Sequence, residues 1–135
     1  MKKSIVVLVC VCVLIMIGCN QQPQQEHVNQ LLVEGNVVKI DVYPLPEGYN
    51  YSFSGKEAKA IIDYLSALNL ESEFKENPNE YGGMTWIIVL EYENGDTLKI
   101  SHFGNMFIRS QNDSWYRMSY EEASRFDALL EELNN

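Results

Sequence analysis

The fold follows mainly from residues 85–103, which read TWIIVLEYENGDTLKISHF. Apolar side chains alternate along its first half, as is typical of a β-strand, and one face has Trp86, Ile88, Leu90 and Tyr92. Ile87 and Val89 on the other face are also apolar, so we expect the middle of this strand to be covered on both faces. Asn94-Gly95 is a favourable two-residue hairpin turn, and residues 97–103 then form the return strand.

Two further strands are expected downstream of this hairpin. A turn at Gly104-Asn105 leads into a strand over residues 106–110. Asn112-Asp113 marks another turn before a strand over residues 114–118. Because each connection is short, the strands should pair with their sequence neighbours as an antiparallel meander.

Amphipathic helices flank the meander on both sides of the sequence. Ser54 with Glu57 and Ser119 with Glu122 match the S-x-x-E capping box that begins many helices. The first helix should end near Asn69. Its apolar face has Ala58, Ile61, Ile62, Tyr64, Leu65 and Leu68. The last helix has Tyr120, Ala123, Phe126, Leu129, Leu130 and Leu133 on its apolar face, with acidic residues opposite.

The remaining segments complete an α+β fold. An alternating stretch over residues 37–43 predicts a strand, and residues 51–53 a short second one. Residues 71–83 are polar and include Asn-Pro-Asn and Gly-Gly, so we expect a long connection there. The sequence therefore predicts an antiparallel sheet of about 4–6 strands, with both helices packed on one face.

The N-terminus has the pattern of an export signal. Lys2 and Lys3 precede an apolar run of 13 residues over 5–17, too short for the roughly 20 apolar residues of a membrane span. The following Gly18-Cys19 is similar to the lipobox of bacterial lipoproteins, although Met16 stands where Leu is usual. That resemblance implies cleavage after Gly18, a diacylglycerol on Cys19, and localisation on the extracytoplasmic face of the cell membrane.

Three segments follow from this pattern. Residues 1–18 are the expected lipoprotein signal peptide, residues 19–33 the lipidated cysteine and a Gln-rich tether, and residues 34–135 a single α+β domain. Cys10 and Cys12 would leave with the signal, so no disulfide is expected. Without the signal peptide the chain has 8 basic and 19 acidic side chains, a net charge of −11. Such a charge excludes a nucleic-acid binder, which needs a clustered basic surface.

No catalytic set stands out. His27 lies in the tether, and His102 is a lone strand histidine that we interpret as structural. No histidine pair or Cys/His spacing forms a metal site, no cofactor motif is present, and no serine lies in a G-x-S-x-G elbow. Acidic residues are abundant, so a carboxylate pair for glycoside cleavage stays open as an alternative. On the last helix we interpret Glu121, Glu122 and Asp127 as a solvated face.

Aromatic residues are the better candidates for a binding surface. Tyr49 and Tyr51 flank an early loop, Tyr81 precedes the meander, and Trp115 and Tyr116 are adjacent in its last strand. Because adjacent strand residues point to opposite faces, one of the last two should face away from the helices. We predict that these five aromatic residues bind a ligand, with the Tyr49–Tyr51 segment lying beside Gly82-Gly83.

Four segments of the chain resemble small uncharacterised lipoproteins and extracytoplasmic domains of clostridia-like Firmicutes. They are Tyr51-Ser52-Phe53 with the helix that follows it, residues 77–85, Phe103-Gly104-Asn105, and the Trp115-Tyr116 strand. The resemblance covers nearly all of the expected domain and implies no catalytic residues. A looser similarity to sensor proteins of the antibiotic-responsive metallopeptidase kind favours binding or sensing.

Three functions remain open on the sequence. We favour a lipid-anchored, non-enzymatic module on the outer face of the membrane that binds a protein or a cell-envelope ligand. One alternative is an envelope hydrolase, which requires two carboxyl groups about 5–9.5 Å apart in a cleft. The other is a structural surface lipoprotein, which requires no concave pocket.

Overall fold

The computed structural model describes residues 35–71, 73–104, 106–109 and 114–135. The expected signal peptide, Cys19, the tether and the Asn112-Asp113 turn lie outside these residues. The elements are β1 (Val37–Leu45), β2 (Tyr51–Phe53), α2 (Gly55–Ser66), β3 (Glu73–Phe74), the 3-10 helix η2 (Pro78–Glu80), β4 (Thr85–Tyr92), β5 (Thr97–Phe103), β6 (Phe107–Arg109), β7 (Trp115–Arg117) and α3 (Tyr120–Leu133).

The protein is α+β, as the sequence predicts, with an antiparallel sheet in the order β2-β1-β4-β5-β6-β7-β3. The β4–β5 hairpin is confirmed, with Ile88 opposite Ile100. Its turn contains Gly95 at a φ of 87°, a conformation that glycine adopts without steric cost. The meander continues through β6 and β7, each paired with its predecessor in the sequence.

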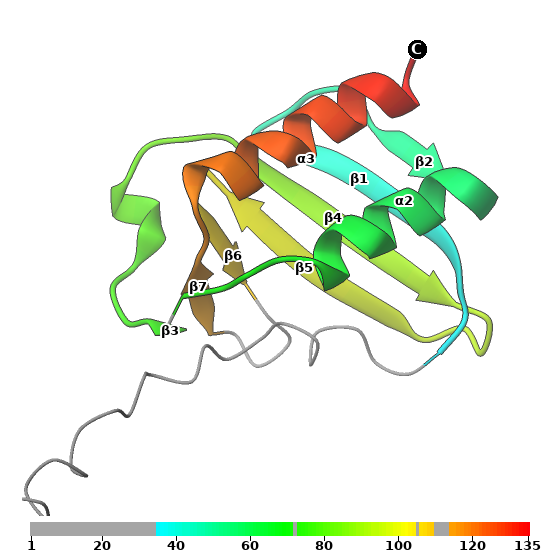
Figure 1. Cartoon of the computed structure of the whole chain (residues 1–135), viewed down its shortest axis with the longest axis horizontal. Coiled ribbons are helices and arrows are strands. Elements are labelled where there is room, and N and C mark those ends of the chain that lie inside the picture. The colour runs from blue at the N-terminus through cyan, green and yellow to red at the C-terminus, as the bar shows by residue number, and fades with distance from the viewer. Residues whose placement is uncertain (1–34, 72, 105, 110–113) are drawn as a thin grey trace, which may run out of the picture.

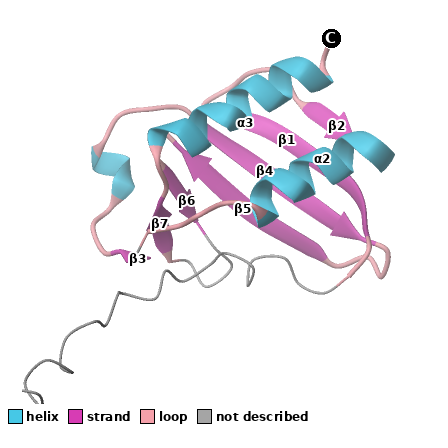
Figure 2. Ribbon diagram, viewed as in Figure 1, coloured by secondary structure: helices cyan, strands magenta, loops and turns pink. Residues whose placement is uncertain are grey.

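Both helices cover the same face of the sheet, as Figures 1 and 2 show. The core lies between them and the sheet, where Ile40, Ile88 and Ile100 are fully buried beneath Ile61 of α2 and Phe126 of α3. These are the positions that the strand and helix periodicities predict. A continuous apolar layer of this kind provides most of the free energy that stabilises such a domain.

The number of strands was predicted too low. Among the described residues the sheet has seven strands, because the polar connection after α2 contributes β3, a strand of two residues that pairs with β7. Glu73 lies opposite Tyr116, and Phe74 opposite Trp115. So short a segment has no periodicity in the sequence, and it becomes a strand because its backbone satisfies the hydrogen-bonding groups along the edge of β7.

Two predictions about the helices were also wrong. Ser54 precedes α2, but its side chain makes no capping hydrogen bond, and the left-handed φ of 55° at Gly55 takes the chain into the helix by an irregular path. The capping box of α3 is confirmed, with Ser119 accepting from the Glu122 amide. Tyr120, predicted for the core face of α3, is 64% exposed, because it lies in the first turn, beyond the part of the helix that covers the core.

The helix-free face of the sheet divides into two unlike halves. Residues directly opposite each other in antiparallel strands share a face, so the strand registers define rows across the sheet. Near the start of β1 the rows are mostly polar, with Lys39 paired to Asp41 at 2.7 Å. The rows at the other end are largely apolar and aromatic: Leu45, Thr85, Phe103, Phe107 and Arg117 form one, and Tyr43, Ile87, Ser101, Arg109, Trp115 and Phe74 the next.

The two aromatic rows lie at the end of β1 opposite its first residue, Val37. The described chain begins just before Val37, at one end of β1. Leu45 lies at the other end and pairs with Thr85, the first residue of β4. Since nine strand residues rise roughly 27 Å, the aromatic rows lie about that far from the point where the N-terminal segment joins the sheet.

Candidate functional site: an aromatic groove

A groove of about 560 Å³ lies at the aromatic end of the sheet. Its walls come from β3, the segment between η2 and β4, the β5–β6 turn, the end of β7 and the first residue of α3. The size falls within the range that binding sites for small molecules and short peptides occupy. The described residues that line it are Phe74, Tyr81, Gly82, Gly83, Met84, Phe103, Gly104, Met106, Phe107, Arg117 and Tyr120.

Three aromatic rings form the floor of the groove. The ring centroids of Phe74 and Phe107 are 4.7 Å apart, those of Tyr81 and Phe107 5.7 Å, and those of Phe74 and Tyr81 6.1 Å. Separations of 4.5–7 Å are favourable between aromatic rings, so each ring holds the others in place. Phe107 is buried and Tyr81 is 49% exposed, so the cluster runs from the interior to the surface.

Tyr81 is positioned by contacts at both ends of the residue. Its amide donates to the Pro78 carbonyl at 2.9 Å, closing the turn of η2, and its hydroxyl donates to Glu76 Oε2 at 3.0 Å. The hydrogen bond to the Glu76 carboxylate raises the pKa of the Tyr81 phenol, which therefore stays neutral. The result is a half-exposed aromatic ring with a fixed orientation at the mouth of the groove.

Two glycines allow the walls of the groove to meet. A Cβ on Gly83 would lie 3.0 Å from the Cα of Gly104, a contact that side chains scarcely tolerate. The Gly104 amide donates to the Met84 carbonyl at 2.9 Å, and Gly104 itself has a φ of 48°. The segment before β4 is thus fixed directly to the β5–β6 turn.

Arg117 is the only charged side chain among the described lining residues. Its nearest ionic partner is Glu71, with 3.9 Å between Arg117 Nε and Glu71 Oε2, and both side chains are about half exposed. A long contact of this kind between exposed groups contributes little to stability. The Arg117 guanidinium therefore provides positive charge beside the aromatic floor.

The structure distributes the five predicted ligand residues over different places. Tyr81 lines the groove, whereas Tyr49 is 86% exposed in the loop before β2. Tyr51 packs against the core, 6.1 Å from the ring of Trp86. Trp115 and Tyr116 point to opposite faces, as predicted: Tyr116 packs on the core, and Trp115 lies on the helix-free face, 6.0 Å from Phe103.

The sequence reasoning placed Gly82-Gly83 beside the predicted ligand segment but missed the other groove residues. Phe74 belongs to a strand that was not predicted, and Arg117 was not considered as a binding residue. A signal for Phe103 was present, because the alternation that places Ile100 and His102 towards the helices turns Phe103 away from them.

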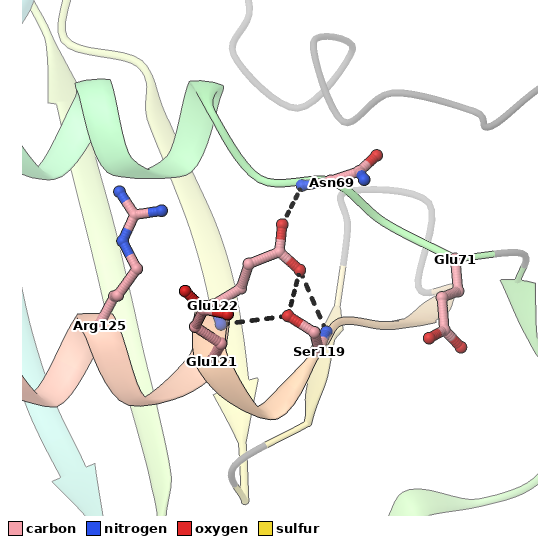
Figure 3. Close-up of a pocket in the computed structure, with 6 residues that line it drawn as sticks. All are labelled: Asn69, Glu71, Ser119, Glu121, Glu122 and Arg125. Atoms are coloured by element: carbon pink, nitrogen blue, oxygen red, sulfur yellow. Dashed lines mark hydrogen bonds between the residues drawn. The ribbon is translucent and has the colours of Figure 1, made fainter.

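A second, polar pocket of about 350 Å³ lies where the chain after α2 meets the start of α3. Figure 3 shows the Glu122 carboxylate at its centre, bonded to the Asn69 amide at 2.8 Å and to the amide and hydroxyl of Ser119 at 3.1 and 2.8 Å. Glu122 thus joins α3 to the chain just after α2. The prediction that it lies on a solvated face was wrong, because its carboxylate is used in these hydrogen bonds. Glu71, Glu121 and Arg125 also line this pocket.

His102 is buried between the sheet and α3, with 2% of its surface exposed. Its Nε2 lies 3.3 Å from the Tyr64 hydroxyl, which donates to the Glu122 carbonyl at 3.1 Å. The other ring nitrogen, Nδ1, is buried and has no hydrogen-bond partner among the described residues. Burial lowers the pKa of His102 to about 4, against a smaller opposing effect of the Asp127 charge.

This environment makes His102 a neutral core residue. Its ring stacks on Phe126 with centroids 5.0 Å apart, and Phe126 stacks in turn on Tyr64 at 5.2 Å. The described residues contain no group of three or more His, Cys, Asp and Glu side chains that could hold a metal ion. None of the helices in the described part of the chain is sufficiently long and apolar to cross a membrane.

The chain was compared with protein families, curated proteins and solved structures. It matches none of them. The function is therefore inferred from the groove and from the N-terminal sequence.

Proposed function

We propose that this protein is a lipid-anchored binding module on the extracytoplasmic face of the cell membrane, and that the aromatic groove is its binding site. The anchor is Cys19, which follows an export signal similar to that of bacterial lipoproteins. The ligand is a protein or a component of the cell envelope. The resemblance to extracytoplasmic lipoproteins and sensor domains supports this class of function.

The observation that carries the proposal is the exposed apolar and aromatic surface that lines the groove. Exposed apolar surface costs free energy in water, so a contiguous patch in a folded domain is a mark of an interaction site. Tyr81, Met84 and Tyr120 are each 48–64% exposed, and all three line the groove. A purely structural role gives no reason to hold these side chains around a concavity.

The anchoring part is tested by metabolic labelling with an alkyne analogue of palmitate. Wild-type protein should incorporate the label and sediment with membranes, and the Cys19→Ala variant should do neither. Label on the Cys19→Ala variant would contradict an anchor at this residue.

The binding part is tested by comparing the proteins and envelope fragments that co-purify with two variants. Tyr81→Ala removes one ring of the groove floor, whereas Tyr49→Ala removes an even more exposed tyrosine outside the groove. Ligands of wild-type protein should be lost from the Tyr81→Ala variant and kept by Tyr49→Ala. Equal recovery from both variants would contradict the groove as the binding site.

A further inference from the structure

We infer that the groove recognises an apolar peptide segment that carries a carboxylate: its apolar side chain lies on Phe74, Tyr81 and Phe107, and its carboxylate pairs with Arg117. This inference rests on the proposed function and names the ligand class of the same site. Four features of the groove support it: the charge of its lining, the exposure of Arg117, its shape and polarity, and its place in the sheet.

The groove lining carries a cation in a protein that is acidic as a whole. The chain has 19 acidic and 10 basic side chains, yet the described lining contains one cation, Arg117, and no carboxylate. Glu71 and Glu76 contact lining residues from outside the groove. Arg117 places a positive charge beside the apolar walls, where it can attract an anionic group.

Arg117 is available to a ligand because its present ionic contact is weak. Glu71 approaches only Nε, at 3.9 Å, and the two side chains are 47% and 56% exposed. A guanidinium can bind a carboxylate through two parallel hydrogen bonds of about 2.7–2.9 Å, a geometry that the Glu71 contact does not have. A ligand carboxylate can therefore compete with Glu71 for Arg117 by adopting this paired geometry.

The remaining lining fits an apolar side chain better than a sugar. Sugars require several hydrogen-bonding groups around an aromatic platform, but the hydroxyl of Tyr81 is already bonded to Glu76. The other walls include Phe103, Met84 and Met106 as well as Tyr120, and methionine adapts readily to apolar ligands of varied shape. A volume of about 560 Å³ accommodates a segment of a few residues.

The place of the groove favours a peptide over a membrane lipid. The N-terminal segment joins the sheet before Val37, and the groove lies at the opposite end of β1, beside Thr85. The groove therefore lies roughly one strand length, about 27 Å, from the start of β1. A protein segment outside the membrane can reach it there.

The test is a titration of the full chain in phosphatidylcholine nanodiscs, with methionine methyl groups labelled with ¹³C for NMR. Met84 and Met106 line the groove, while Met118 is fully buried in the core and serves as the internal reference. The probes are N-acetyl-Ala-Phe with a free carboxylate, the same dipeptide as its amide, and N-acetyl-Ala-Ala with a free carboxylate.

We expect the Phe acid to shift the Met84 and Met106 signals and leave Met118 in place. It should bind at least fivefold more tightly than either its amide or the Ala acid. Arg117→Gln should abolish the preference for the acid, and Glu71→Gln should strengthen it by removing the competing carboxylate. Arg125→Gln is the matched control, because Arg125 is an exposed arginine outside the groove.

Three results would overturn the inference. Equal binding of the acid and the amide would show that Arg117 does not read a carboxylate, although the groove would remain a binding site. If replacing phosphatidylcholine by phosphatidylglycerol in the nanodiscs shifts the Met84 and Met106 signals and the dipeptides do not, the ligand is a lipid. A titration in which no dipeptide moves either signal would exclude this peptide class. The proposed function is tested independently of this titration. It is contradicted if the Tyr81→Ala and Tyr49→Ala variants recover the same ligands.

Discussion

The indole Nε1 of Trp86 donates a 2.9 Å hydrogen bond to Oδ1 of Asp127, which lies 41 residues further along the chain. This bond ties the start of β4 to the middle of α3 and holds the helix over the sheet. Sequence reasoning placed Asp127 on a solvated face of α3, and that interpretation was wrong for this residue. The carboxylate is partly buried and accepts from the only polar atom of the indole.

Asp127→Ala should lower the free energy of unfolding by about 1–2 kcal/mol, because a partly buried indole N–H loses its charged acceptor. Chemical denaturation would measure the change. A double-mutant cycle with Trp86→Phe should return a coupling of about 1 kcal/mol. Asp63→Asn is the control, since Asp63 pairs with Lys59 where both side chains are more than 60% exposed. An equal loss of stability in Asp127→Ala and Asp63→Asn would contradict a stabilising role of the Trp86–Asp127 hydrogen bond.

His102 should make stability depend on pH in a defined window. The unfolded chain takes up a proton on this residue near pH 6.5, and the folded protein only near pH 4. The free energy of unfolding therefore falls as the pH drops through this window, by at most about 3 kcal/mol, and His102 has no such effect above it. Subtracting the pH profile of His102→Leu from that of the wild type isolates the contribution.

His27→Gln provides the control for this pH experiment. The sequence has two histidines, and His27 lies in the predicted tether. Its substitution should leave the pH profile of stability unchanged. A His102→Leu variant with the wild-type slope between pH 4 and 6.5 would show that His102 is not buried in neutral form.

The two serines that precede the helices should differ in their effect on stability. Ser119→Ala should cost about 1 kcal/mol, because the Ser119 side chain accepts from the Glu122 amide in a complete capping box. Ser54→Ala should cost much less, because the Ser54 side chain makes no capping bond. Thermal unfolding of both variants decides this, and a larger loss for Ser54→Ala would contradict the described caps.

Gly83 and Gly82 offer a test of how the groove is held together. A methyl group on Gly83 would press on the Gly104 backbone, so Gly83→Ala should destabilise the protein by about 1 kcal/mol and weaken ligand binding. Gly82→Ala meets nothing within 4 Å and should change stability little. Chemical denaturation measures the stability of the two variants, and ligand recovery is the second readout. Equal stability and equal recovery for Gly83→Ala and Gly82→Ala would refute the close contact.

The parts of the fold that follow from periodicity could be predicted. The β4–β5 hairpin has an alternating pattern and an Asn-Gly turn, and α3 has a regular apolar face, so both elements lie where expected. β3 could not be predicted, because a strand of two residues exists only through its pairing with β7. Local sequence does not encode that contact.

The candidate site was harder to predict for the same reason. Tyr81 was identified from its position before the meander, but its neighbours Phe74 and Phe107 are brought to it by β3 and β6. Tyr51 looked like a surface aromatic, yet the pairing of Val42 with Tyr51 turns its ring towards Trp86 and the core. Sequence therefore indicated the residue types of the site, whereas long-range strand pairing decided its members.

We propose that the groove, at the end of β1 opposite Val37, is where this protein binds its ligand. Photo-cross-linking in intact cells tests it most directly, with p-benzoylphenylalanine placed at Tyr81 or at the exposed Lys99 in the polar half of the same sheet face. We predict defined adducts from position 81 and none from position 99. Identical adducts from both positions, or adducts from position 99 alone, would contradict the account.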